Sequence, residues 1–370
     1  MIMAEVQDEH FYLAAILRCP GIGCRYLRQL LESMGSAAAV WRADKDDLIA
    51  ARVLTPRLAQ RLADFCRQHE AVPEAIKKTC EKKLIHTVSI MEENYPEVLR
   101  EIYAPPVLLY YTGILEPDAR RVAMVGARRF SGYGQAAALE FGEKLAAAGL
   151  TVVSGAARGI DTFSHLGALK AGRTVAVLGC GVDIAYPSEN RKLLYDIADS
   201  GGAVISEYEP GTRPLPAYFP ARNRIISGLA EGTLVLEAAA RSGSLITAEM
   251  ALSAGRDVYA VPGSIYSPGC AGCNHLIQQG AKLVTEPKDV LEEFNLAPAE
   301  NKSSAKVKLT AEEQAIYQVL SFDHALSLDE IMMSLPDGEI ANLSYLLLEM
   351  EFKGIVIENE MHAYRRAERE

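Results

Sequence analysis

The chain has 370 residues, enough for two or three domains. Charged residues make up 23% and hydrophobic residues 49%, a composition typical of globular proteins rather than of disordered chains. The longest early apolar run, residues 11–17, lacks the basic leader of a secretory signal, and no run approaches the roughly 18 residues of a membrane span. Seven cysteines, an odd number, do not indicate a disulfide framework. We therefore expect a soluble cytoplasmic protein without a membrane partner.

The formal net charge of −10 is unevenly distributed along the chain. Residues 120–275 carry 15 Lys and Arg against 13 Asp and Glu, a net charge of +2, whereas residues 306–370 carry 6 against 13, a net charge of −7. Net charge governs long-range attraction, but a local basic cluster can still bind an anion. The acidity of the whole chain therefore does not exclude nucleic acid as a partner of the central region.

Four segments follow one another along the chain. Residues 1–75 show apolar residues at helical spacing around Pro20-Gly21-Ile22-Gly23, which predicts a helical domain of the SAM or helix–hairpin–helix type, with SAM preferred. Residues 82–296 alternate apolar runs with amphipathic stretches. Residues 297–307 are polar and predict a linker. Residues 308–370 form a last small domain.

Short apolar runs within the second segment predict β-strands that alternate with helices. Continuous apolar strands are typical of parallel sheets that helices cover on both faces, so we expect an α/β fold, a Rossmann-like doubly wound and mostly parallel sheet. The predicted strands are 122–125, 151–153, 174–178, 203–205, 233–236, 258–261 and 282–284, and the clearest helices are 135–148 and 245–254. Ligands of such sheets bind at the carboxyl ends of the strands, where this sequence places small and polar residues.

The turn after the first of these strands contains Gly126, Arg128 and Ser131. A dinucleotide-binding turn has G-x-G-x-x-G spacing, but Arg128 and Ser131 stand where the second and third glycines belong. The second strand also ends in Ser154-Gly155, whereas a dinucleotide site needs an acid there for the ribose. An arginine followed by a serine at a helix start favours a phosphate. The alternative is a glycine-rich turn with Arg128 facing solvent.

A second anion site is predicted at Arg222, Asn223 and Arg224. Apolar residues after Arg224 begin a helix, so this cluster would lie at the positive end of the helix dipole. The alternative is that the two arginines form ion pairs with Glu237 or Glu207.

Two more segments place small polar residues or arginine at the same edge. Ser242, Gly243 and Ser244 begin a helix, where Ser244 would be the cap and the first amides would form a concave anion site. Gly155 and Arg158 add an arginine beside another glycine turn. Several anion sites at one edge indicate a polyanion or a nucleotide as the ligand.

No catalytic or metal-binding set accompanies these residues in the sequence. His165 and His275 have no partner in a nucleophile motif, and no G-x-x-x-x-G-K-[ST] loop occurs. Cys270 and Cys273 make one C-x-x-C pair without a second pair at zinc spacing, so we interpret them as buried thiols. We therefore expect no catalytic residue, no metal and no cofactor.

Seven blocks of residues together resemble the DNA-processing protein A (DprA, also called Smf) family. They follow one another over about 190 residues, a far more specific pattern than any single glycine motif. The blocks are Gly126-Ala127-Arg128, Ser154–Asp161, Tyr186-Pro187-x-x-Asn190, Phe219-Pro220-x-Arg222-Asn223-Arg224, Ser242–Thr247, Val261-Pro262-Gly263 and Gly272–Ala281. Cys270 and Cys273 depart from the expected pattern and receive no role.

The resemblance implies a cytoplasmic homodimer without enzymatic activity that binds single-stranded DNA. It also implies protection of incoming DNA during natural transformation (competence) and loading of the RecA recombinase in DNA recombination. The resemblance and the predicted anion sites together give a set of candidate DNA-binding residues. They are Gly126, Arg128, Ser131, Gly155, Arg158, Arg191, Arg222, Asn223, Arg224, Ser242, Gly243, Ser244 and Asn274.

An alternative function is a nucleotide-binding or nucleotide-hydrolysing enzyme on a related Rossmann-like fold. Phosphoribohydrolases of this kind carry a Pro-Gly-Gly-x-Gly-Thr-x-x-Glu loop. Gly232-Thr233 and Glu237 match that loop only loosely, because the Pro-Gly-Gly lead is missing and the spacing differs. Release of free base from nucleoside monophosphates would distinguish this alternative.

The last segment, residues 308–370, resembles a winged helix with three helices and a pair of wing strands. A third helix that reads DNA should carry Lys and Arg. This helix instead carries Glu339, Glu349 and Glu351 against Lys353. We therefore expect the segment to contact protein rather than duplex DNA.

Overall fold

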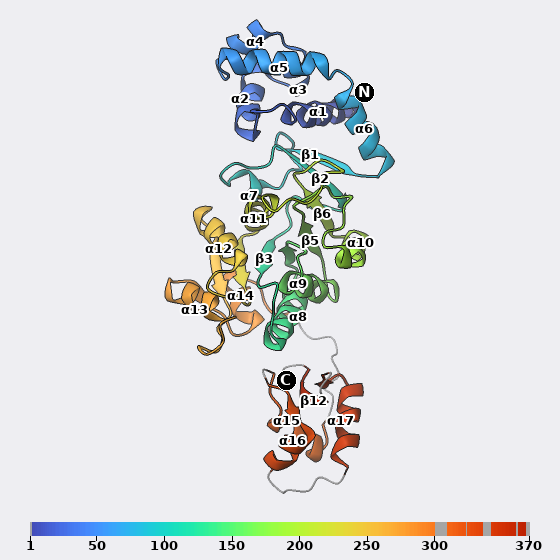
Figure 1. Cartoon of the computed structure of the whole chain (residues 1–370), viewed down its shortest axis with the longest axis vertical. Helices are drawn as coiled ribbons and strands as arrows, with labels where there is room; N and C mark the ends of the chain where they lie inside the picture. Colours follow the sequence, from blue (N-terminus) through green and yellow to red (C-terminus); the bar gives the residue numbers. More distant parts are fainter. Residues whose placement is uncertain (1, 300–308, 323, 336–341, 360–361, 368–370) are drawn as a thin grey trace.

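The computed structural model describes residues 2–299, 309–322, 324–335, 342–359 and 362–367 (Figure 1). Most of the predicted linker lies outside these described residues. None of the described helices combines the length and the apolar character needed to cross a membrane.

Within the described residues, a nine-stranded sheet runs in the order β1-β2-β6-β5-β4-β3-β7-β8-β9. The strands are β1 (His86–Ser89), β2 (Leu108–Gly113), β3 (Arg121–Val125), β4 (Thr151–Ser154), β5 (Thr174–Val177), β6 (Ala203–Ser206), β7 (Gly232–Val235), β8 (Asp257–Ala260) and β9 (Lys282–Leu283). Strands β3 to β9 pair in parallel, which confirms the expected doubly wound fold. Each of the seven predicted strands is present within one residue of its expected bounds.

Two strands at one edge of the sheet were not predicted. β1 pairs antiparallel with β2, and β2 pairs antiparallel with β6. They precede the regular alternation of strand and helix, so the pattern that revealed the parallel strands does not extend to them.

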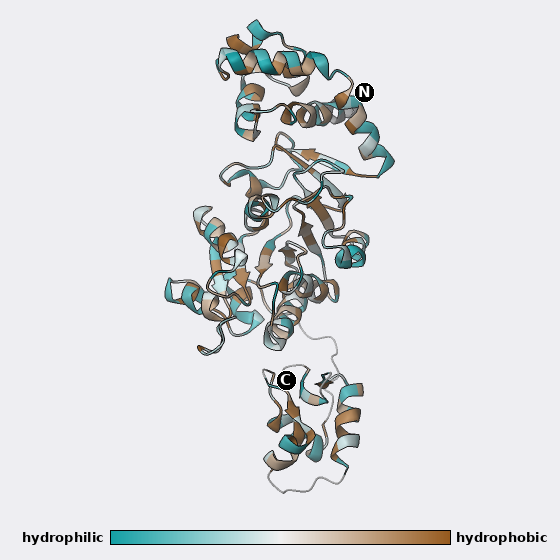
Figure 2. Ribbon diagram, in the orientation of Figure 1, coloured by the Kyte–Doolittle hydropathy of each residue, from teal (hydrophilic) through white to brown (hydrophobic). Residues whose placement is uncertain are grey.

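Figure 2 shows that the central strands are largely hydrophobic. Alternate residues of these strands pack against helices on opposite faces. Val122 and Met124 of β3 share a core with α8 and α9, whereas Ala123 and Val125 share a core with α11 and α12. This follows from the two-residue period of a strand. The helices around the sheet are α7 (Glu97–Arg100), α8 (Gly132–Ala147), α9 (Ile160–Leu169), α10 (Arg191–Asp199), α11 (Tyr218–Gly228), α12 (Gly243–Ser253), α13 (Ala271–Gln278) and α14 (Pro287–Glu293).

The N-terminal helices continue beyond the expected boundary at residue 75 as far as Lys82. They are α1 (Ile2–Leu17), α2 (Cys24–Met34), α3 (Ala37–Arg42), α4 (Lys45–Ala50), α5 (Pro56–Gln68) and α6 (Val72–Lys82). Leu27 of α2 and Trp41 of α3 belong to the same hydrophobic cluster as one face of the sheet. The N-terminal helices are therefore packed onto the sheet through β1 and β2.

The described residues after 308 have a hydrophobic core of their own. The elements are α15 (Ala311–Val319), β10 (Leu326–Ser327), α16 (Leu328–Ser334), α17 (Leu343–Phe352), β11 (Val356–Glu358) and β12 (Ala363–Arg366). Ile316, Ile331 and Leu347 are fully buried in a cluster that contains no residue of the large sheet. The expected third-helix residue Glu339 lies outside the described residues, and the winged-helix interpretation stays a prediction.

Candidate functional site

The order in which strands join the sheet reverses beside β3. β4, β5 and β6 follow on one side of β3, and β7, β8 and β9 follow on the other. In doubly wound sheets a crevice opens at the carboxyl ends of the strands next to such a reversal, and ligands bind there. Here the two loops at that reversal are residues 126–131, after β3, and residues 236–242, after β7.

A carboxylate of the protein itself joins these two loops. Glu237 is 4% exposed, and its Oε2 accepts hydrogen bonds from the backbone N–H of Ser131 at 3.0 Å and from the Ser131 hydroxyl at 3.1 Å. Ser131 caps α8 by accepting a bond from the N–H of Gly134 at 3.1 Å. The positive end of α8 is therefore compensated by Glu237, which argues against the predicted phosphate contact of Ser131.

Two predicted glycines are explained by contacts inside the protein. A Cβ on Gly126 would lie 2.7 Å from the side chain of Ile160, and one on Gly155 would lie 2.5 Å from the guanidinium of Arg222. Glycine at these positions lets α9 and Arg222 approach the strands closely. Neither glycine needs a bound ligand to account for it.

The start of α12 differs from the prediction in its capping residue. Ser242, rather than Ser244, is the N-cap, since its hydroxyl accepts a bond from the N–H of Ser244 at 3.3 Å. Ser244 is buried, and its hydroxyl lies 2.7 Å from that of Ser242. A Cβ on Gly243 would meet nothing within 4 Å, so this turn stays open to a ligand.

Arg222, expected to bind phosphate directly, is an interior residue. It is 4% exposed, and its Nη1 donates to the carbonyls of Gly155, at 2.6 Å, and of Val177. Its Nε donates to Asn223 Oδ1 at 3.2 Å. Burial lowers the pKa of Arg222 to about 10, and nearby Asp161 opposes that shift. In this arrangement Arg222 joins the carboxyl ends of β4 and β5 and does not reach outward to a ligand. Because α11 begins at Tyr218, residues 222–224 lie inside the helix, and the prediction that they occupy its positive end is wrong.

Two other predicted arginines pair with carboxylates on neighbouring loops. Arg158 pairs with Glu189 at the surface, where both side chains are more than half exposed. Arg224 pairs with Glu207 in a less exposed position, as the ion-pair alternative expected, and burial raises the pKa of Glu207 while Arg224 opposes the shift. An exposed pair contributes at most about 1 kcal/mol, so Arg158 can exchange Glu189 for a phosphate at small cost.

Arg128 and Arg191 are the predicted cations that remain exposed and form no ion pair with another described residue. The guanidinium carbon of Arg128 lies 5.8 Å from the centroid of the Phe219 ring. Arg191 is the first residue of α10. Sequence reasoning missed three further exposed arginines on loops that leave the same edge after β3, β6 and β7, namely Arg129, Arg213 and Arg241.

Aromatic rings lie beside Arg128. The centroids of Phe219 and Tyr186 are 5.4 Å apart, and Tyr186 is 43% exposed. We call Arg128, Tyr186 and Phe219 the Arg128 aromatic surface. Rings next to a guanidinium suit the stacking of nucleic-acid bases. The signal that could have found them is an aromatic residue directly before a proline, on the loop after β5 for Tyr186 and in the first turn of α11 for Phe219.

The remaining predicted residue, Asn274, positions a loop. Its Oδ1 accepts a bond from the N–H of Gly263 at 3.2 Å, and its Nδ2 donates to the Gly263 carbonyl at 3.0 Å. Cys270 and Cys273 are buried free thiols, and burial raises the pKa of Cys273 to about 12. No group of side chains suited to a metal ion occurs in the described part of the chain.

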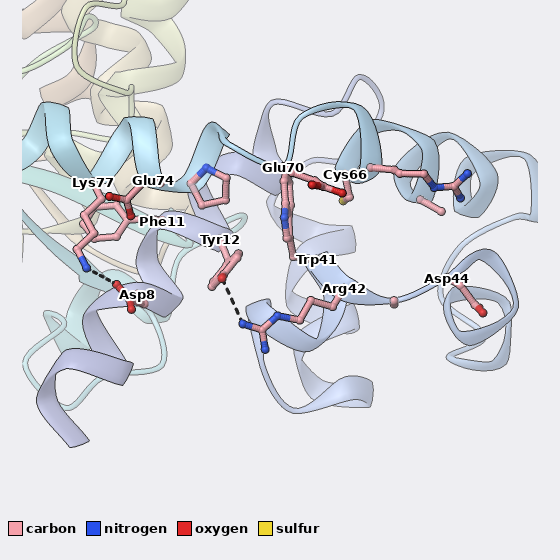
Figure 3. A pocket seen from close by; sticks show the side chains of 14 residues that line it. Asp8, Phe11, Tyr12, Trp41, Arg42, Asp44, Cys66, Glu70, Glu74 and Lys77 are labelled. Atoms are coloured by element: carbon pink, nitrogen blue, oxygen red, sulfur yellow. Dashed lines mark hydrogen bonds and ion pairs between the residues drawn. The ribbon is translucent and has the colours of Figure 1, made fainter. Parts of the chain in front are cut away.

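A cavity of about 510 Å³ lies away from this edge, among the N-terminal helices (Figure 3). Tyr12 and Trp41 contribute to its lining, and acidic and basic side chains alternate around it. On its rim Lys77 pairs with Asp8 at 2.7 Å. Because both signs of charge line this cavity, it does not favour an anion. It is therefore not the anion site that the sequence predicts at the sheet edge.

Comparison with known proteins gives a consistent set of relatives. Residues 86–295 match the family described as DNA recombination-mediator protein A. The chain is 50% identical over 208 residues to the DNA processing protein DprA of Streptococcus pneumoniae (strain ATCC BAA-255 / R6), which covers 56% of this chain and 73% of that protein.

Solved structures show the same relationship. The X-ray structure of DNA processing protein A from Streptococcus pneumoniae matches with a TM-score of 0.66 and 39% identity, covering 76% of this chain and 97% of the other. A structure of DNA processing protein A from Helicobacter pylori, described for its single-stranded DNA binding mode, matches with a TM-score of 0.52 and 28% identity, covering 57% and 95%.

Proposed function

This chain belongs to the DNA recombination-mediator protein A family, and from that membership we propose that it binds single-stranded DNA at the carboxyl edge of its sheet. The observation that carries the proposal is the Arg128 aromatic surface, in which a guanidinium that forms no ion pair with a described residue lies beside the ring of Phe219, and Tyr186 lies beside that ring. The Helicobacter pylori relative, described for its single-stranded DNA binding mode, supports the choice of ligand.

Phosphates and bases would engage different residues. Arg128 and Arg191 hold phosphates, Arg158 joins them by releasing Glu189, and bases stack on Tyr186 and Phe219. Binding of this kind depends little on sequence and weakens steeply with salt. Glu237 keeps phosphates away from the start of α8, so the strand passes over the loops that follow β3, β4 and β5.

The biological role that we propose is DNA processing in natural transformation and recombination. The name of the Streptococcus pneumoniae relative supports DNA processing. Protection of incoming strands, RecA loading, a homodimeric state and a cytoplasmic location are the finer parts of the proposal. Sedimentation of the purified chain tests the dimer, and RecA filament growth on strands coated with single-strand-binding protein tests the loading.

The role is one of binding rather than catalysis. The alternative nucleotide hydrolase would depend on Glu237, which is buried and bonded to Ser131. Incubation with nucleoside monophosphates should release no free base. If the parent protein released free base and the Glu237→Gln protein did not, the hydrolase alternative would be established.

Fluorescence anisotropy with labelled oligothymidylate of about 20 nucleotides tests the DNA site. Arg128→Ala should weaken binding about tenfold, and equally for oligonucleotides of mixed sequence. Arg173→Ala is the matched control, because Arg173 is also exposed but precedes β5 at the opposite edge. Equal affinity of the Arg128→Ala and Arg173→Ala proteins would show that the site is placed wrongly.

We propose that the C-terminal residues 308–370 contact protein. On α17 the side chains of Tyr345, Leu348 and Phe352 are 59%, 48% and 85% exposed, at the spacing of one helix face. Arg366, one of the few cations of this segment, donates to the Tyr317 carbonyl at 2.7 Å. A chain without residues 306–370 should keep its oligothymidylate affinity within about threefold, and a larger loss would assign DNA contacts to this segment.

A further inference from the structure

Residues 2–82 contain two units with the same distribution of charge. Each unit consists of two helices joined by a turn. One turn joins α1 to α2, and the other joins α4 to α5. The segments Arg18–Arg28 and Ala51–Arg61 each carry three arginines and no acid. The rest of residues 1–82 carries six Lys and Arg against eleven Asp and Glu. Positive charge is therefore concentrated at the two turns and at the helices that they begin.

The two units pack against each other. Arg61 Nη1 donates to the carbonyl of Pro20, in the first turn, at 3.2 Å. The hydroxyl of Ser33, near the end of α2, donates to the carbonyl of Ala51, in the second turn, at 3.4 Å. Figure 1 shows α2 and α4 on the side of the N-terminal helices away from α6, and α5 running from that side toward α6. The arginines of both turns consequently share one region of the surface.

The arginines that remain available form what we call the two-turn arginine surface: Arg25, Arg28, Arg52, Arg57 and Arg61. These side chains are exposed or half-buried, and none forms an ion pair with another described residue. The sixth arginine, Arg18, is excluded because it pairs with Glu209. Arg25 and Arg28 are three residues apart on α2, so they lie on one face of that helix. Arg57 and Arg61, four residues apart on α5, likewise share one face.

The backbone of the second turn supports a role for its arginine. Arg52 has a φ of 56°, in the left-handed region, and the first turn has Gly21 there with a φ of 94°. A Cβ disfavours this conformation, so glycine is its usual occupant. The second turn keeps an arginine despite that cost, and strained residues of this kind concentrate at functional sites.

We propose that the two-turn arginine surface binds the sugar–phosphate backbone of duplex DNA. Its guanidiniums would pair with phosphates, and Gly23, around whose Cβ position nothing lies within 4 Å, would let a phosphate reach the first amides of α2. Tyr26 is the sole aromatic residue of the two segments. A single strand needs stacking rings, whereas a duplex keeps its bases stacked on one another, so the surface suits a duplex.

This surface is separate from the proposed single-strand site, and it favours the helix–hairpin–helix interpretation of the N-terminal helices over the SAM interpretation. The full chain would hold a duplex at one end and a single strand at the sheet edge. Such a pair of sites fits a junction between the two forms of DNA.

Anisotropy of the full chain with a labelled blunt duplex of about 20 base pairs tests the proposal. Arg57→Glu should weaken duplex binding about tenfold and make its salt dependence shallower. The matched control is Arg67→Glu, in the same helix but outside the surface, where Arg67 is 69% exposed and lies 3.8 Å from Asp64. Arg52→Gly should also weaken duplex binding while leaving the melting temperature unchanged or higher, because glycine relieves the strain at that turn.

The two proposed DNA sites can fail independently. Arg57→Glu and Arg52→Gly should change oligothymidylate affinity by less than about twofold, and Arg128→Ala should leave duplex affinity equally unchanged. Duplex binding that is absent in the full chain, or that is the same in Arg57→Glu and Arg67→Glu, would overturn this inference. Loss of oligothymidylate binding in Arg128→Ala concerns only the sheet edge.

Discussion

The carboxylate of Glu237 accepts a hydrogen bond from the backbone N–H of Ser131 at 3.0 Å, at the first turn of α8. Helix starts of this kind, beside the strand reversal of a doubly wound sheet, commonly hold the phosphates of nucleotides. Here a buried side chain from the loop after β7 takes that place. The contact moves the expected path of DNA toward the loops after β4 and β5.

Glu237→Gln should change oligothymidylate affinity by less than about twofold, because phosphates are expected to bind elsewhere. The amide keeps the shape of the carboxylate and can still accept the bond from Ser131. If the start of α8 were the phosphate site, removal of the negative charge would strengthen binding about tenfold. Anisotropy titrations of both proteins at one salt concentration distinguish the two outcomes.

Tyr186→Leu should weaken oligothymidylate binding about tenfold, since a stacked base contributes roughly 1–3 kcal/mol. Leucine fills space against Phe219 but offers no ring to a base. Tyr103→Leu is a suitable control, because Tyr103 is 92% exposed and lies before β3, outside the carboxyl-end loops. Similar affinities for the two variants would remove Tyr186 from the binding surface.

Arg222→Ala should lower the free energy of unfolding by about 2–4 kcal/mol, because it leaves a cavity and unpaired carbonyls at Gly155 and Val177. Arg128→Ala should lower it by less than about 0.5 kcal/mol, since Arg128 is exposed. Urea unfolding measures both values. An Arg222→Ala protein with normal stability and no DNA binding would instead make Arg222 a direct ligand of DNA.

Stability should fall as the pH drops below about 6.5, partly through His165. This residue is fully buried, and burial lowers its pKa to about 3. Its Nδ1 lies 2.6 Å from the hydroxyl of Thr174, which itself donates to the Val152 carbonyl. Below pH 6.5 the unfolded chain therefore binds a proton that the folded chain does not, which costs up to about 1.4 kcal/mol per pH unit down to about pH 3.

The variant His165→Asn checks this effect, because asparagine can donate to Thr174 and does not titrate. The free energy of unfolding should change between about pH 7.5 and pH 5 by roughly 2 kcal/mol less in the variant than in the parent protein. Buried and paired carboxylates contribute equally to both proteins and cancel in the comparison. An identical pH dependence would show that His165 titrates normally in the folded state.

The sequence by itself determined the parallel part of the sheet, β3 to β9. Runs such as Val122–Val125 and Ala203–Ile205 are continuously apolar because helices cover both of their faces, and that pattern is local enough to be recognised along the chain. Arg128 could also be predicted from the local sequence, because it stands in a turn directly after a predicted strand. Residues of this kind are specified by their immediate neighbours.

Only the tertiary structure decided which of the charged residues face a ligand. Glu237 and Ser131 are 106 positions apart, and Arg222 and Gly155 are 67 apart, yet each pair is joined by a hydrogen bond at the carboxyl edge of the sheet. Parallel strands bring loops from distant parts of the chain to one edge of the sheet. At that edge an arginine either bonds to a carbonyl, pairs with a carboxylate or is exposed to solvent. Arg222 meets carbonyls and is used inside the protein, whereas Arg128 meets solvent and an aromatic ring and stays available to bind DNA.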